Sequence, residues 1–369
     1  MSDKPVGVAL IGTGAVALAN HLPGVRLIPG AEMVALCDPD LSVLERAARQ
    51  SGITRGYANV DGVLAQRNVD AVIIATPNDV HKNIALRAIA SGRHVLCEKP
   101  LALTSADARE MYQAAERAGV RHMTAFTYRF VPAMRYMKHL ISTGALGRPW
   151  HFRAKRMQDW GRRFLGWRQQ AAAAGTGELG DMLSHRLDFG HYLIGPLVRV
   201  LARMKQVHES RIDASGREHP SDLEDWVACI GDFHDGTTAV LESTKLATGR
   251  GEGGRSPDYC EVNGVAGTAV YELGRPHEIG LAAEGRPFEF VPVPREFLTP
   301  PGAPRDPLQG DPIQTFRYDQ AFEFIQAIRE DRPCQPSFLD GLRVQRVMDA
   351  IVDSSRSGCM TAVRDAVKP

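Results

Sequence analysis

Five short apolar runs within the first 125 residues constrain the fold of this 369-residue chain more than any other feature. Each run is almost continuously apolar, as a strand buried on both faces must be. Helical patterns such as LSVLERAARQSG and SADAREMYQAAERAG separate them. This alternation predicts an α/β fold with a parallel, doubly wound sheet. The predicted strands are VGVALIG (6–12), EMVALCD (32–38), AVIIATP (71–77), HVLCEKP (94–100) and RHMTAF (121–126).

The second part of the chain has a different pattern. Segments that alternate apolar and polar residues dominate, and FHDGTT and VNGVAGT between them are hairpin signals. Two helical patterns, YDQAFEFIQAIRED and LDGLRVQRVMDAIVDSS, lie near the end. We therefore predict two domains, residues 1–125 and an α+β domain of residues 126–369 with a mostly antiparallel sheet. Its predicted strands are WHFRAKRM, VRVLARMKQV, DWVACIGDF, TTAVLEST, DYCEVNG and GTAVYEL.

Composition excludes several classes of function. The chain has 44 Lys and Arg against 43 Asp and Glu, so its charge of +1 gives no reason to expect nucleic acid or an anionic membrane as partner. No apolar run reaches the roughly 18 residues that cross a bilayer, and we expect no secretory signal. Six scattered cysteines without a CxxC pair argue against a zinc site or a disulfide framework. We expect no metal site and a reducing, cytoplasmic location.

The first predicted strand ends in a glycine-rich turn, GTGAVA. Gly12, Gly14 and Ala17 form the pattern G-x-G-x-x-A between a strand and a helix. The first glycine permits the turn, the second lets the backbone approach a pyrophosphate, and the small third residue packs helix against strand. The pattern predicts a Rossmann dinucleotide-binding domain. We expect its cofactor contacts at Gly12, Thr13, Gly14, Ala15 and Val16.

An acidic residue ends the second predicted strand. Asp38 follows Ala17 by 21 residues, about where a carboxylate would bind the hydroxyls of the adenosine ribose. The alternative is a helix N-cap or turn residue within CDPD. A carboxylate at this position would repel a 2′-phosphate, so the sequence favours NAD over NADP. Arg46 or Arg49 would weaken that preference by turning toward the site.

The stretch GTGELGDMLSHRLDFGHYLIG (175–195) combines polar and apolar residues on one predicted helix. Asp181 and His185 are four residues apart, so they share a face. An imidazole suits a general base because its pKa lies near neutrality, and a carboxylate can orient the ring. The alternative is an ion pair that merely stabilises the helix. A zinc site built on His185 and His191 is not expected, because an offset of six residues puts them on different faces.

Taken together, six motifs resemble the Gfo/Idh/MocA oxidoreductase family. The resemblance runs from residue 6 to PSFLDGLRVQRVMDAIVDSS, and it implies an open mixed sheet that covers the nicotinamide and makes subunit contacts. It also implies that Lys99 of the EKP segment joins Asp181 and His185 as the catalytic group, acting on a sugar or polyol hydroxyl. The motifs are GTGAVA, CDPD, ATPNDVH, CEKPLALT, TYRFVPAMRYMKHLISTGALGRP and GTGELGDMLSHRLDF.

The resemblance also implies further contacts. Cofactor contacts are expected at Thr76, Pro77, Asn78, His81, Glu98, Lys99 and Arg168. Substrate contacts are expected at Lys99, Tyr128, Gln158, Trp160, Trp167, Asp181 and His185, as in a subgroup that acts on pyranoses and anhydrosugars. The alternatives are a plain Pro-Asn turn after the third strand and tryptophans that belong to the core. Arg162 and Arg163 either meet an acidic substituent of the substrate or lie on the surface.

The sequence therefore predicts an NAD-dependent dehydrogenase for a sugar, anhydrosugar or polyol that forms a homodimer or homotetramer. Two alternatives stay open. One is a glycosidase that holds NAD and cleaves its substrate through a transient keto-sugar. The other is a non-catalytic NAD-binding regulator, although such a protein has no need of Lys99, Asp181 and His185 together.

Overall fold

The computed structural model describes residues 4–162, 164–253 and 256–367. Their contacts divide the chain into two units. The first comprises residues 1–102, 106–130 and 299–342, and the second comprises residues 103–105, 131–298 and 343–369. The domain boundaries predicted from the sequence, 1–125 and 126–369, place residues 299–342 in the second domain, whereas the structure assigns them to the first unit.

The first unit is built on a six-stranded, wholly parallel sheet in the order β3-β2-β1-β4-β5-β6, the order of a Rossmann fold. The five predicted strands are confirmed, and the short β3 is additional. The strands are β1 (Val6–Ile11), β2 (Ala31–Cys37), β3 (Gly56–Tyr57), β4 (Ala71–Ile74), β5 (His94–Cys97) and β6 (His122–Thr124).

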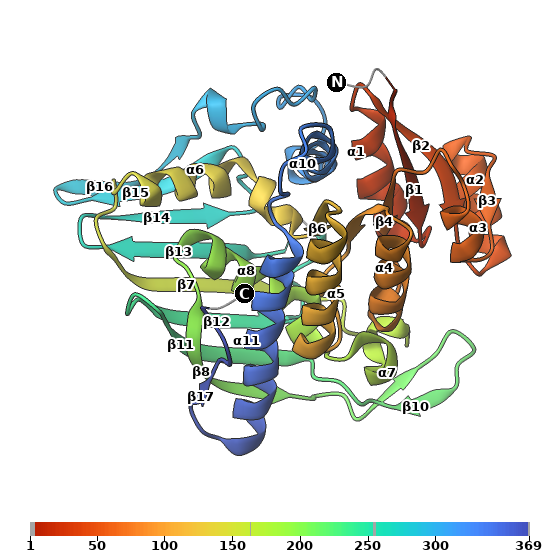
Figure 1. Ribbon diagram of the computed structural model, residues 1–369. Helices are drawn as coiled ribbons and strands as arrows, with labels where there is room; N and C mark the ends of the chain where they lie inside the picture. Colours follow the sequence, from red (N-terminus) through yellow and green to blue (C-terminus); the bar gives the residue numbers. More distant parts are fainter. Residues whose placement is uncertain (1–3, 163, 254–255, 368–369) are drawn as a thin grey trace. The chain divides into compact units, whose positions relative to one another are not determined.

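Helices cover both faces of this sheet (Figure 1). One apolar cluster joins the sheet to α3, α4 and α5, and the other joins it to α1, α2 and α10. The helix α10 comes from the C-terminal part of the chain and contacts α1 directly. The helical segments of the unit are η1 (Ala17–His21), α1 (Leu22–Arg26), α2 (Leu41–Ser51), α3 (Val60–Leu64), η2 (Asn78–Val80), α4 (His81–Ala90), α5 (Ser105–Ala118), η3 (Thr127–Phe130), α9 (Pro312–Thr315) and α10 (Tyr318–Arg329).

The second unit is built on a nine-stranded sheet in the order β16-β15-β14-β13-β7-β12-β11-β8-β17. Among the described residues of this sheet, only β7 and β12 pair in parallel, so the predicted mostly antiparallel sheet is confirmed. Both predicted hairpins are present. The strands are β7 (Pro149–Met157), β8 (Leu197–Lys205), β11 (Trp226–Phe233), β12 (Thr238–Thr244), β13 (Asp258–Gly264), β14 (Gly267–Glu272), β15 (Glu278–Ala283), β16 (Arg286–Pro292) and β17 (Thr361–Ala362), with a separate hairpin of β9 (Ser210–Ile212) and β10 (Glu218–Pro220).

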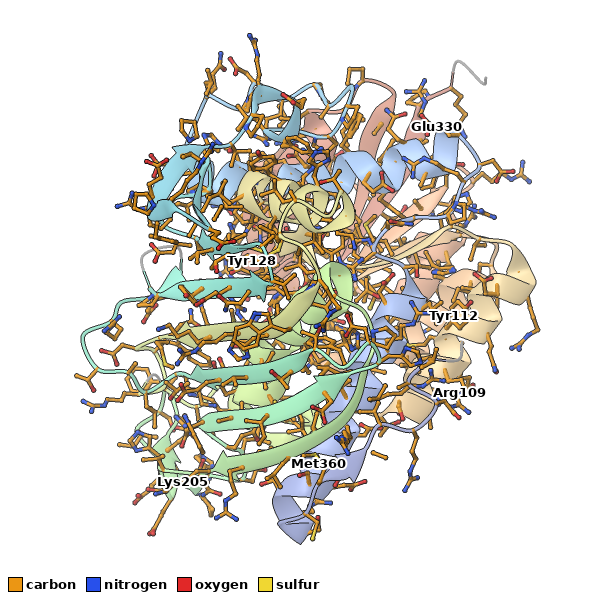
Figure 2. The ribbon with its side chains drawn as sticks, turned by 90° about the vertical axis from the view of Figure 1, so that its left-hand side faces the viewer. Arg109, Tyr112, Tyr128, Lys205, Glu330 and Met360 are labelled. Atoms are coloured by element: carbon orange, nitrogen blue, oxygen red, sulfur yellow. The ribbon has the colours of Figure 1, made fainter. Side chains whose placement is uncertain are left out.

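One face of this sheet is covered by the helix that carries Asp181 and His185. Its first turn, η5 (Leu179–Leu183), is a π-helix in which Ser184 N donates to Leu179 O, and α8 (Ser184–Leu193) continues it. These turns contact β7 and β12, and η5 also contacts β11. Figure 2 shows the side chains along these strands. The other helical segments of the unit are α6 (Pro132–Ser142), η4 (Trp167–Gln169), α7 (Ala171–Ala174), η7 (Arg295–Phe297) and α11 (Phe338–Ser357), which starts in the first unit.

Candidate active site

The glycine turn after β1 has the shape that a dinucleotide phosphate requires. Gly12 has a φ of +84°, and a Cβ placed there would lie 2.5 Å from Ala75 O, so the turn is closed behind this residue. A Cβ on Gly14 would meet nothing within 4 Å, so the chain is open in front of the helix start. The turn therefore fits a phosphate that approaches the backbone at Gly14.

Asp38 stabilises this turn from the end of β2. Its Oδ2 accepts hydrogen bonds from Thr13 N at 2.9 Å and from Thr13 Oγ1 at 3.1 Å. Its Oδ1 accepts one from Asp40 N. The N-cap of α2 is Asp40, whose carboxylate accepts from Ser42 N and Val43 N. Asp40, and not Asp38, is therefore the N-cap of α2, and the Asp38 carboxylate is fixed beside the glycine turn.

The loops after β4 and β5 are tied together by buried polar groups. His81 is fully buried, with Nδ1 3.0 Å from Pro100 O and Nε2 3.1 Å from Thr76 O. Burial lowers the pKa of His81, which favours the neutral ring. These contacts make His81 a positioning residue for the loops that carry Thr76, Pro77, Asn78 and Lys99.

Glu98 fixes the start of the EKP segment. Its Oε1 lies 2.8 Å from Nε2 of His21, a residue of η1, and its Oε2 accepts from Lys99 N. Burial by itself raises the pKa of Glu98, but His21 and Lys99 outweigh it and leave the pKa below its usual value. The carboxylate therefore links the Lys99 loop to the helix that follows the glycine turn. Sequence reasoning missed His21, because its neighbours in the chain give no signal for this contact.

Tyr128, labelled in Figure 2, lies on η3 and is almost fully buried. The guanidinium of Arg317 lies over its ring at 5.3 Å from the centroid, and the ring of Phe316 is 5.8 Å away. The side chain thus has a fixed position within the first unit.

Two buried polar contacts attach the Asp181 helix to the sheet of the second unit. Glu178 accepts a hydrogen bond from Ser243 Oγ on β12. Arg186 forms an ion pair with Asp258 on β13, and Arg156 of β7 lies 3.5 Å from the same carboxylate. Burial, helped by the negative charge of Asp181, raises the pKa of Glu178 to about 8. The helix is therefore held at both ends of the Asp181–His185 segment.

Asp181 and His185 differ in exposure. The Asp181 side chain is partly exposed, whereas His185 is 4% exposed. Arg168 Nε lies 3.8 Å from Asp181 Oδ1, and its guanidinium stacks over the ring of Trp167 at 4.3 Å. The structure thus brings Arg168 to the Asp181 carboxylate, whereas the sequence analysis expected Arg168 to contact the cofactor.

The segment directly after β7 carries Gln158 and Trp160. Gln158 is buried, and its amide oxygen has no hydrogen-bond partner among the residues that the structure describes. Trp160 is half-buried above the ammonium of Lys245. Arg162 is exposed and donates to Thr248 Oγ1, so it lies on the surface. Arg163 falls outside the described residues.

Neither a metal cluster nor a membrane span is found in the described part of the chain. Within residues 4–162, 164–253 and 256–367, no three His, Cys, Asp or Glu side chains are grouped so that they could hold a metal ion. Across the same ranges, no helix combines the length and the apolar character needed to cross a membrane.

Comparison with known proteins identifies the family. Residues 6–126 match the oxidoreductase family with an NAD-binding Rossmann fold, and residues 134–270 match the GFO/IDH/MocA C-terminal domain. The chain belongs to the GFO/IDH/MocA family. It is thus an oxidoreductase with an NAD-binding domain, as the glycine turn and Asp38 predicted.

Members of the GFO/IDH/MocA family that resemble this chain over most of its length include sugar dehydrogenases. Levoglucosan dehydrogenase of Pseudarthrobacter phenanthrenivorans is 31% identical over 95% of this chain and 96% of its own. D-apiose dehydrogenase of Paraburkholderia graminis is 29% identical over 95% and 88%. The structure of levoglucosan dehydrogenase in complex with NADH and levoglucosan superposes with a TM-score of 0.89 at 30% identity, covering 98% of this chain and all of the other.

Proposed function

We propose that this chain is an NAD-dependent dehydrogenase that oxidises a secondary hydroxyl group of a sugar, an anhydrosugar or a polyol. The observation that carries the proposal lies in the second unit. Asp181 and His185 lie on a helix that packs on β7, and Gln158, the residue directly after β7, has an amide oxygen that is buried without a partner among the described residues. Buried amides normally have partners, and a hydroxylated ligand would supply the missing donor. The relatives named for levoglucosan and apiose support the same substrate class.

The proposed catalytic group consists of Lys99, Asp181 and His185. When NAD is bound, its nicotinamide accepts the hydride that leaves the substrate carbon. His185 takes the hydroxyl proton onto its neutral imidazole, and Asp181 stabilises the imidazolium that forms. The ammonium of Lys99 stabilises the negative charge that develops on the oxygen. Tyr128, Trp160 and Trp167 are the proposed walls of the sugar site, with Gln158 as hydrogen-bond acceptor.

The proposed cofactor site is formed by groups that the first unit already fixes. Gly12–Val16 would hold the pyrophosphate, Asp38 the adenosine ribose, and Thr76–Asn78 would lie along the cofactor. His81 and Glu98 would act by positioning these loops. Arg168 remains a proposed contact for the cofactor phosphates, in addition to its ion pair with Asp181.

The proposed reaction is tested by following NADH absorbance at alkaline pH with a panel of sugars, polyols, anhydrosugars and glycosides. Net NADH formation with a free sugar or anhydrosugar supports the dehydrogenase. Cleavage of an aryl glycoside without net NADH would instead indicate a glycosidase that reoxidises its cofactor internally. NAD binding with no turnover of any compound would indicate a regulator.

Asp38 is expected to set the cofactor preference. Wild-type protein should bind NAD far more tightly than NADP, because the carboxylate repels a 2′-phosphate. Asp38→Asn keeps an acceptor for the Thr13 hydrogen bonds but removes the charge, so the ratio of NAD to NADP affinity should fall by about tenfold or more, which corresponds to about 1.4 kcal/mol. Calorimetric titration with each nucleotide measures the ratio.

Asp40→Asn is the matched control, because it also removes a negative charge but retains a good N-cap for α2. It should leave the preference unchanged. Wild-type protein that binds NADP as tightly as NAD would refute the assignment of Asp38.

We also propose a homodimer or homotetramer that assembles through the large sheet. On the face opposite η5 and α8, the strand β11 presents Ile230 with 49% of its surface exposed. A broad sheet face with exposed apolar residues is usually covered in solution. Light scattering at micromolar concentration should show a dimer or tetramer, and Ile230→Asp should weaken this association. A monomeric wild-type protein would contradict the proposal.

We also propose a cytoplasmic location, because all six cysteines are free thiols.

A further inference from the structure

The segment Gln158–Gly161 is fixed by the last residue of β12 and the residue that follows it. Gln158 N donates to Thr244 O at 2.8 Å. Trp160 N and Gly161 N both donate to Lys245 O, at 3.1 and 2.8 Å. The main chain that carries Gln158 and Trp160 is therefore attached to Thr244 and Lys245 rather than free to move as a loop.

Gly161 is packed so closely that no side chain fits. A Cβ at this position would lie 2.5 Å from Leu246 Cδ2, 2.8 Å from Lys245 Cγ and 2.9 Å from Lys245 O. The carbonyl of Gly161 also accepts a hydrogen bond from the guanidinium of Arg211. The backbone next to Trp160 is thus held from both sides.

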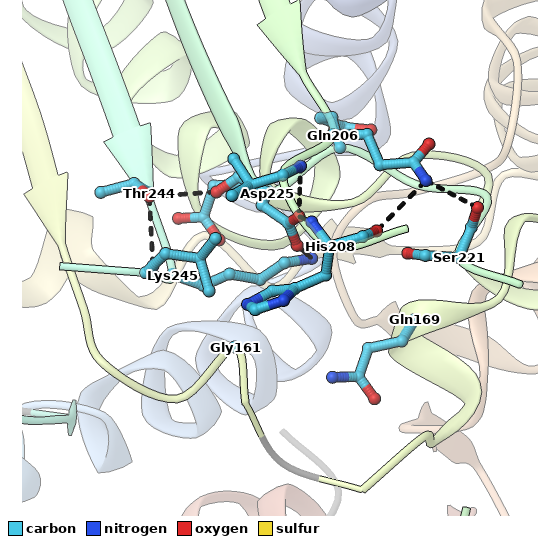
Figure 3. A network of polar contacts seen from close by, with 12 residues as sticks. Gly161, Gln169, Gln206, His208, Ser221, Asp225, Thr244 and Lys245 are labelled. Atoms are coloured by element: carbon cyan, nitrogen blue, oxygen red, sulfur yellow. Dashed lines mark hydrogen bonds and ion pairs between the residues drawn. The ribbon is translucent and has the colours of Figure 1, made fainter. Parts of the chain in front are cut away.

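The Lys245 side chain is itself buried, with 1% of its surface exposed. Its ammonium lies 3.6 Å from Asp225 Oδ1 and 5.4 Å from the ring centroid of Trp160. Asp225 is also buried, and it accepts hydrogen bonds from Arg211 and from the backbone N–H groups of Val207 and His208. Figure 3 shows this network around Asp225 and Lys245.

Burying an ammonium group is costly unless a counter-charge lies close to it. Asp225 supplies the counter-charge, and its other hydrogen bonds fix its position. The buried ammonium of Lys245 thus lies over one face of the half-buried Trp160 ring. In the proposed sugar site, the ring would use its other face to stack on the ligand while this cation supports the first.

We propose that Lys245, held by Asp225, is a positioning residue that determines substrate affinity by fixing the indole of Trp160 for stacking on a sugar ring. The inference rests on the proposed function, in which Trp160 contacts the sugar. Lys245 does not touch the reacting atoms in this scheme. It acts through Trp160, so its loss should weaken substrate binding and spare the chemical step.

The test compares Lys245→Met with wild-type enzyme on a sugar that the panel above identifies as substrate. KM should rise about tenfold, because without the ammonium the indole spends less time in the orientation that stacks on the sugar, while kcat changes less than about threefold and NAD affinity stays constant. Lys155→Met is the matched control: Lys155 lies over the ring of Tyr259 at 5.0 Å in the same sheet, and its loss should leave KM unchanged. If Lys245→Met does not fold, Lys245→Gln keeps a donor for Asp225 without the charge and should give the same rise in KM.

A double-mutant cycle separates failure of this inference from failure of the proposed function. In a Trp160→Ala background, Lys245→Met should cause no further rise in KM, because the residue through which it acts is gone. If Trp160→Ala raises KM but Lys245→Met does not, the positioning role is wrong and the sugar contact stands. If Trp160→Ala itself leaves KM unchanged, the proposed contact is wrong. Additive effects of the two substitutions would overturn the inference by showing that Lys245 acts independently of the ring.

Discussion

Replacing His185 by alanine should lower kcat by about 10²–10⁴-fold, the typical contribution of general acid–base catalysis. NAD affinity should hardly change, because His185 belongs to the unit that does not contain the glycine turn. The rate of wild-type enzyme should rise with pH through an apparent pKa that belongs to the coupled Asp181, His185 and Lys99 group.

Lys99→Ala should lower kcat and weaken substrate binding together, because its ammonium is proposed to contact the oxygen in both the ground state and the transition state.

The measurements are kcat, NAD affinity and the melting temperature of each variant. His191→Ala makes the same chemical change further along α8 and serves as control. If Asp181 and His185 were only a structural pair, His185→Ala would lower the stability, because the side chain is buried, and leave kcat intact. An active variant with a lowered melting temperature would therefore assign the pair a structural role.

Local patterns were sufficient to predict much of the fold. The strands β1, β2, β4, β5 and β6 are buried apolar runs, and such runs have few other ways to satisfy their backbone. β15 and β16 were not predicted, because EIGLAA and RPFEFVP lack a clear alternation and most of β16 is exposed at the sheet edge. The helix α10 was predicted as a helix, but its packing against α1 depends on contacts between distant segments that no local pattern encodes.

The sequence indicated candidate site residues, but not the contacts that these residues make in the folded chain. GTGAVA and Asp38 indicated the glycine turn of a dinucleotide-binding domain. They did not indicate that Asp38 accepts hydrogen bonds from Thr13, or that Asp40 is the N-cap of α2. Glu178 belongs to the motif GTGELGD, but its raised pKa follows from the burial of its carboxyl group, which no local pattern shows. Lys245 gave no signal, because a lysine after a strand is normally exposed and its burial here depends on Asp225.

Replacing Asp258 by asparagine should lower the free energy of unfolding of the second unit by about 3–5 kcal/mol, because it leaves the guanidinium groups of Arg156 and Arg186 buried without their counter-charge. All four tryptophans lie in this unit, so urea titration followed by tryptophan fluorescence reports its unfolding. Asp232→Asn breaks the exposed pair with Arg199 and should cost no more than about 1 kcal/mol. Equal, small losses in both variants would show that the Asp258 cluster contributes no more than a surface ion pair.

The same variant should also reduce kcat at temperatures where the protein is fully folded. Residues 184–190 of α8 are all buried, so apolar burial alone does not determine which side of this helix faces the sheet. The ion pair of Arg186 with Asp258 is directional, and it fixes the rotation of the helix one residue away from His185. Without that contact the helix can turn, and the imidazole loses the fixed orientation that general base catalysis requires. A stability loss accompanied by an unchanged kcat would show that apolar packing alone orients His185.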